Sequence, residues 1–172
     1  MIVIINGPNG IGKTSTAWEL SARFDRAVML DGDHIGAVHP FEIYDDARIT
    51  YLYRTLAHLI AFHQREGGYA NFVINYVFES PESLEDLRRR LRPLDDRIYA
   101  FRLVAAESAI EARILARDTG DDAAWHLNRF RELLAIQEAA ARRGDLGEAL
   151  DTTALSVAEA VDVIWRRVGG KP

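Results

Sequence analysis

Residues 7–14 read GPNGIGKT, in which Gly7 is followed after four residues by Gly12, Lys13 and Thr14. This spacing is typical of a loop whose backbone amides hold phosphate oxygens. Lys13 would reach the β- and γ-phosphates of a nucleotide, and the Thr14 hydroxyl would bind Mg²⁺. A plain glycine-rich turn is the alternative, but such a turn would not require the Lys-Thr pair. The motif therefore predicts an ATP and Mg²⁺ site.

The segments on both sides of the loop fit this interpretation. An apolar run at 2–5 predicts a strand before the loop, and residues 15–24 predict a helix after it. The glycines let the backbone turn tightly, and the start of the helix points its positive end at the phosphates. The expected nucleotide contacts in the loop are Gly7, Asn9, Gly10, Ile11, Gly12, Lys13, Thr14 and Ser15.

Two acids and a histidine follow the second apolar run, in the order Asp31, Gly32, Asp33, His34. In an open parallel sheet, ligands bind beyond the carboxyl ends of the strands, which is also where the phosphate loop lies. Asp33 would there orient an acceptor hydroxyl, take its proton and help to hold Mg²⁺ through water. Asp31 would be a supporting partner of Asp33 beside the ligand. The alternative is a turn that only caps the next segment.

Apolar runs alternate with amphipathic helices along the chain, which predicts an α/β fold with a five-stranded parallel sheet and helices on both faces. The strands are expected at 2–6, 27–31, 70–78, 98–105 and 148–151. One helix is expected over 47–65 before Gly67 and Gly68, another opens at Ser80 and Pro81, and Ser156 with Glu159 predicts a capping box for the last. No linker or repeat divides the chain, so we expect a single domain over 1–172.

Composition limits the classes of protein to consider. The chain has 172 residues, 48% of them hydrophobic and 27% charged, and it has no cysteine, so disulfides and thiol catalysis are excluded. No apolar run is long enough for a bilayer, and the first apolar segment is interpreted as a strand instead of a signal peptide, so we expect a cytoplasmic protein. A net charge of −5 disfavours a nucleic-acid partner.

Together these residues resemble the family of small P-loop kinases, which includes adenylylsulfate, gluconate and shikimate kinases, chloramphenicol phosphotransferase and the tunicamycin-resistance protein. The resemblance rests on GPNGIGKT, on LDGDH at 30–34, and on DTT at 151–153. It implies a three-layer P-loop fold with a small lid, an acceptor-activating role for Asp33, and adenine contacts at Thr152 and Thr153. The two resistance proteins suggest an antibiotic as one candidate acceptor.

Arg113 and Arg117 lie four residues apart on a helix expected over 107–118 and so share one face. The polar residues 118–124 predict a mobile loop, and we expect a lid over about 118–128. The resemblance implies that Arg113 packs against adenine and that Arg117 reaches the transferring phosphate as a catalytic group. The alternative is an exposed helix with ordinary Glu-Arg pairs.

The acceptor pocket should lie beside the ends of the second and third strands. Its candidate contacts are Asp31, His34, Arg48, Arg54, Asn75 and Tyr76. Many P-loop enzymes have an aspartate where this chain has Asn75, so Mg²⁺ would rely on Thr14, Asp33 and water. The sequence thus predicts an ATP- and Mg²⁺-dependent phosphotransferase acting on a small-molecule hydroxyl. Alternatives are a nucleoside or nucleotide kinase, a polynucleotide 5′-hydroxyl kinase, and an ATP-binding switch or sequestering protein without catalysis.

Overall fold

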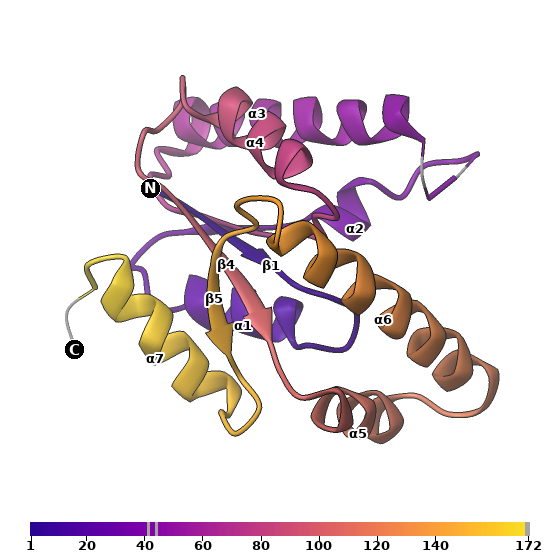
Figure 1. Ribbon diagram of the computed structural model, residues 1–172. Coiled ribbons are helices and arrows are strands. Elements are labelled where there is room, and N and C mark those ends of the chain that lie inside the picture. Colours follow the sequence, from indigo (N-terminus) through magenta and orange to yellow (C-terminus); the bar gives the residue numbers. More distant parts are fainter. Residues whose placement is uncertain (41, 44, 171–172) are drawn as a thin grey trace.

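A computed structural model describes residues 1–40, 42–43 and 45–170 of the chain, and its centre is one parallel sheet (Figure 1). The strand order is β2-β3-β1-β4-β5. The strands are β1 (Ile2–Asn6), β2 (Val28–Asp31), β3 (Phe72–Asn75), β4 (Ile98–Val104) and β5 (Glu148–Asp151). All four pairings are parallel, which confirms the predicted five-stranded sheet. The third strand is shorter than the predicted 70–78.

Alternate residues of β1 enter two separate cores, because successive side chains of a strand point to opposite faces. Ile2 and Ile4 pack with α3 (Asp46–Gly67) and α4 (Pro81–Leu91). Val3 and Ile5 pack with α1 (Lys13–Ser21) and α7 (Val157–Arg167). Figure 1 shows these two pairs of helices on opposite faces of the sheet. Burial of β1 on both faces explains why its sequence is an unbroken apolar run.

Three further helices border the carboxyl edge of the sheet: α2 (Gly32–Ile35), α5 (Glu107–Arg117) and α6 (Gly120–Ala141). The predicted mobile loop over 118–124 is wrong, because only residues 118 and 119 separate α5 from α6. Asp121 and Asp122 lie in the first turn of α6, where acids interact favourably with the helix dipole. The other helix-start predictions hold: Ser80 accepts from Ser83 N, and Ser156 and Glu159 form the capping box.

Among the described residues, no helix is both long enough and apolar enough to cross a bilayer.

A buried hydrogen-bond network around Asn6 joins the end of β1 to α6. Asn6 Oδ1 accepts from the amides of Gly7 (2.7 Å) and Phe78 (2.9 Å) and from Gln137 Nε2 (2.8 Å). Asn6 Nδ2 donates to the Leu146 carbonyl at 3.0 Å. One fully buried side chain thus ties the phosphate loop to α6 and to the segments after β3 and before β5.

We expect Asn6→Ala to lower the free energy of unfolding by about 3 kcal/mol, because several buried donors lose their acceptor at once. Urea denaturation followed by circular dichroism measures this loss. The matched control is Asn71→Ala, since the Asn71 side chain makes a single hydrogen bond among the described residues, an exposed one to the Arg26 carbonyl, and its loss should cost under about 1 kcal/mol. Equal losses in the two variants would contradict a special role for the network.

Candidate active site

The phosphate loop has the backbone that its glycines predict. Gly10 and Gly12 have φ angles of 75° and 100°, a region that favours glycine. At Gly10 a Cβ would also lie 2.4 Å from Ile114 Cγ1, so α5 packs directly on the loop. Gly12 is the N-cap of α1, which begins at Lys13 and therefore directs its unpaired amides into the loop.

Lys13 is buried at 7% exposure, and its Nζ donates to the Pro8 carbonyl at 3.1 Å, so its side chain folds back across the loop. Burial lowers the pKa of Lys13, while the charges of Asp33 and Asp31 oppose that change. A cation held without full hydration beside free backbone amides is a strong site for phosphate oxygens.

Thr14, Asp31 and Asn75 form a polar cluster at the adjoining ends of β2 and β3. Asn75 Nδ2 donates to Asp31 Oδ2 (2.8 Å) and to Thr14 Oγ1 (3.2 Å), and Thr14 Oγ1 lies 3.3 Å from Asp31 Oδ2. Burial raises the pKa of Asp31, but hydrogen bonds from Asn75 and from the His34 and Asp33 amides outweigh it, so the net pKa is lowered. Asp31 is therefore an anchored carboxylate beside Thr14.

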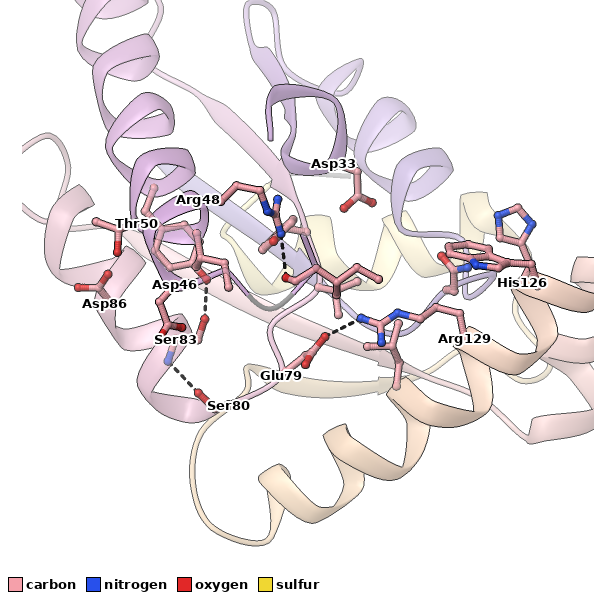
Figure 2. A pocket seen from close by; sticks show the side chains of 18 residues that line it. Asp33, Asp46, Arg48, Thr50, Glu79, Ser80, Ser83, Asp86, His126 and Arg129 are labelled. Atoms are coloured by element: carbon pink, nitrogen blue, oxygen red, sulfur yellow. Dashed lines mark hydrogen bonds and ion pairs between the residues drawn. The ribbon is translucent and has the colours of Figure 1, made fainter. Parts of the chain in front are cut away.

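Two cavities meet above this edge of the sheet. The loop cavity, of about 680 Å³, is lined by residues 9–16, by α5, by Thr152, and by residues 155–157. The α3–α6 cavity, of about 740 Å³, lies between α3, α4 and α6 (Figure 2). Among the described residues, Asn9, Asp33 and His126 line both cavities. Figure 2 shows Asp33 and His126 on two different elements beside this space, and they belong to α2 and α6 respectively.

The Asp33 carboxylate lies at the junction of the two cavities. The surrounding protein removes part of its hydration and raises its pKa, while the positive charge of Lys13 opposes this rise. Its neighbour Asp31 is fixed instead, because Asp31 Oδ1 accepts from the Asp33 and His34 amides at 2.9 and 3.2 Å and so caps α2. Asp31 is thus held by hydrogen bonds, whereas Asp33 faces both cavities.

Arginines and a histidine form the far wall of the loop cavity. Arg113 Nη2 donates to the Thr152 carbonyl at 2.6 Å, which links α5 to the turn after β5. Arg117 donates to Asp118 through Nε (2.8 Å) and Nη2 (2.6 Å). His126 Nδ1 lies 2.7 Å from Asp118 Oδ2, so one carboxylate positions both Arg117 and His126. The charge of Arg117 also contributes to the lowered pKa of Lys13, after burial.

Most predicted nucleotide contacts line the loop cavity: Asn9, Gly10, Ile11, Gly12, Lys13, Thr14, Ser15, Arg113, Arg117 and Thr152. Gly7 and Thr153 do not. Gly7 donates to Asn6, and Thr153 Oγ1 accepts from the Ala106 amide at 2.8 Å. These two residues support the cavity from outside.

The predicted acceptor contacts are divided between the cavities. Arg48 and Tyr76 line the α3–α6 cavity, whereas Asp31 and His34 line the loop cavity. Arg54 and Asn75 line neither. Sequence reasoning missed several polar residues of the α3–α6 cavity: Asp46, Glu79, Ser80, Ser83, Asp86, His126 and Arg129. They come from three separate segments of the chain, so no spacing within a single segment could have predicted them.

The loop cavity fits a nucleotide triphosphate with Mg²⁺. The Asn9 Nδ2 donor is buried beside the loop without a hydrogen-bond partner in the part of the chain described, and a phosphate oxygen would satisfy it. No group of three or more His, Asp or Glu side chains suited to hold a metal occurs among the described residues. Mg²⁺ bound with phosphates needs only one or two protein oxygens, and Thr14 with Asp31, in place of the predicted Asp33, would provide them.

No protein-family profile matches this chain, and no curated protein matches it either. Solved structures do match. The tunicamycin resistance protein of Deinococcus radiodurans superimposes with a TM-score of 0.67 at 22% identity, covering 99% of this chain and 96% of that one. A sugar kinase from Janibacter sp. HTCC2649 gives 0.68 at 15% identity, over 96% and 92% of the two chains. Shikimate kinase from Bacteroides thetaiotaomicron gives 0.64 at 13%, over 98% of each. The chain therefore has the fold of the small P-loop kinases.

Proposed function

We propose that this protein is a kinase that transfers the γ-phosphoryl group of ATP to a hydroxyl of a small molecule held in the α3–α6 cavity. One observation carries the proposal: Asp33 lines both cavities, so a single carboxylate reaches a hydroxyl on one side and the phosphate site on the other. A protein that only binds ATP has no need of a second cavity that opens onto the same acid.

The residues divide the chemistry between them. The loop amides and Lys13 bind the β- and γ-phosphates, and Thr14 with Asp31 would hold Mg²⁺, which neutralises charge on the phosphate oxygens when bound. Asp33 accepts the acceptor's hydroxyl proton as that oxygen forms its bond to the γ-phosphorus and the bridging bond to ADP breaks. Arg117, which donates to Asp118 and lines the loop cavity, would stabilise charge on the transferring oxygens. His126 closes the junction from α6.

The proposal is tested by incubating the protein with Mg²⁺-ATP and a mixed acceptor panel and analysing the products by mass spectrometry. The panel contains tunicamycin, chloramphenicol, nucleosides, nucleotides, sugars and sugar acids. Tunicamycin is included because a tunicamycin resistance protein shares the fold. We expect one acceptor to gain a phosphoryl group in proportion to the ADP formed. Tight ATP binding with only slow release of inorganic phosphate would contradict the proposal and support a binding or switching protein.

A further inference from the structure

The charged groups of the α3–α6 cavity determine which acceptors it can hold, if the proposed function is correct. Its charged lining comprises Asp33, Asp46, Arg48, Glu79, Asp86 and Arg129, with the aromatic rings of Tyr53, Tyr76 and Trp125 between them. Figure 2 shows these charged side chains distributed around one space. Which of them is available to a ligand depends on its present partners.

Both arginines are already occupied. Arg48 is buried at 8% exposure and donates from Nε, Nη1 and Nη2 to the carbonyls of Glu42 (2.9 Å), Gly36 (3.3 Å) and Ile43 (3.0 Å). Arg129 is bound by two carboxylates, through Nη2 to Glu79 (2.8 Å) and Nη1 to Glu132 (2.7 Å). The charge of Arg129 is therefore compensated by two carboxylates, and three of the five N–H donors of Arg48 are directed to carbonyls, so an acidic acceptor would meet only the remaining N–H groups of two arginines that are held in place.

Of the four carboxylates, two are paired with arginines. Asp86 accepts from Arg90 at 3.1 Å and also from Arg89, and Glu79 is bound to Arg129. Across residues 1–40, 42–43 and 45–170, the carboxylates of Asp33 and Asp46 form neither an ion pair nor a hydrogen bond. Asp46 is solvent-exposed in the first turn of α3 and lines the cavity. The two charged side chains of the cavity that have no partner among the described residues are therefore both anionic.

The exposed ring of Trp125 also favours a cationic ligand. Trp125 lines the cavity with 57% of its surface exposed, which is unusual for the largest apolar side chain. An exposed indole face attracts an ammonium group and also packs against apolar parts of a ligand. The cavity volume of about 740 Å³ suits a ligand larger than one sugar ring.

We infer that the α3–α6 cavity selects an alcohol that carries a protonated amine, and that it rejects alcohols that carry a carboxylate or phosphate. Asp46 is assigned as the residue that binds the amine, and Asp33 is left to the hydroxyl. This selection deepens the proposed function, since it names the chemical class of the acceptor.

The test uses β-1,4-linked trimers of glucosamine, glucose and glucuronate at a mildly acidic pH that keeps the amines protonated, so that trimers with the same linkage are cationic, neutral and anionic. Binding is measured by calorimetry without nucleotide, and phosphoryl transfer by mass spectrometry with Mg²⁺-ATP. We expect the glucosamine trimer to bind at least about tenfold more tightly than the glucose trimer, and the glucuronate trimer to bind least.

Two variants separate recognition by Asp46 from general attraction to an acidic protein. Asp46→Asn should reduce the preference for the glucosamine trimer about tenfold. Asp121→Asn should leave the preference unchanged, because Asp121 is likewise an exposed first-turn acid of a 22-residue helix but lines neither cavity.

The inference and the proposed function fail in different ways. Equal or tighter binding of the glucuronate trimer, no binding of the glucosamine trimer, or equal effects of the two variants would overturn the inference. Phosphorylation of the glucuronate trimer would do the same while leaving the kinase proposal intact. If the glucosamine trimer binds through Asp46 and no phosphorylated product forms with any acceptor, the selectivity stands and the kinase proposal fails.

Discussion

Asp33→Asn is expected to lower the rate of phosphoryl transfer about 100- to 10,000-fold, because it removes the only carboxylate that lines both cavities in the described part of the chain. ATP should bind at least as tightly as before. The substituted side chain would no longer place a negative charge near Lys13 and the phosphates, and its amide is nearly the same size as the carboxylate. Turnover is measured by ADP release, and ATP binding by calorimetry.

The pH dependence of the wild-type reaction tests separately whether Asp33 acts as the base. Asp33 acts as a base only when ionised, and its pKa is raised from the ordinary value of 3.8, chiefly because the protein around it removes hydration. The value of kcat/KM should therefore fall as the pH decreases through a pKa above 3.8. Asp33→Asn should lack this acidic limb, since an amide does not titrate there.

The control for Asp33 is Asp25→Asn, which removes an exposed aspartate that lines neither cavity. It should match the wild type in rate and in pH profile. Unchanged turnover in Asp33→Asn would show that Asp33 does not act as the base. Loss of ATP binding in parallel with turnover would assign Asp33 to the nucleotide site alone.

The sheet and the phosphate loop could be predicted because their signals are local. Each buried strand reads as a short apolar run, and the loop requires glycines at fixed positions whatever surrounds it. The segment after Arg117 could not be assigned in the same way. Thr119, Gly120, Asp121 and Asp122 suit a polar loop, but they equally suit the start of a helix, and packing of α6 on α5 decides between the two.

The acceptor contacts were harder to predict, because they depend on the phase of α3 and on segments distant in the sequence. Arg48 and Arg54 are six residues apart, so they differ by about 120° around a helix with roughly 100° per residue. Arg48 is buried against the cavity, and Arg54 is exposed outside it. Arg113 illustrates a related limit: its helix face was predicted, but its partner is the Thr152 carbonyl, which only the folded chain brings near.

Lys13→Met is the second substitution with a large expected effect, about a 1,000-fold loss of kcat/KM for ATP, because the phosphates lose a cation held in a poorly hydrated site. Methionine retains most of the volume and the unbranched stem of the buried side chain. Steady-state kinetics with varied ATP measure the loss. Arg23→Met is the matched control, since it removes an exposed cation that is paired only with Asp162 among the described residues.

The stability of the Lys13→Met protein should move in the opposite direction from its activity. Burial lowers the pKa of Lys13, so the folded state holds the charged form less favourably than the unfolded chain does, and this cost declines as the pH rises from the lowered pKa toward the ordinary value of 10.5. Without ligand at neutral pH, the variant should therefore unfold at the same temperature as the wild type or higher. ATP should raise the unfolding temperature of the wild type and of Arg23→Met, but not that of Lys13→Met, because only a ligand that binds the folded state stabilises it. A Lys13→Met protein that is less stable without ligand, yet is still stabilised by ATP, would show that Lys13 supports the fold and does not hold the phosphates.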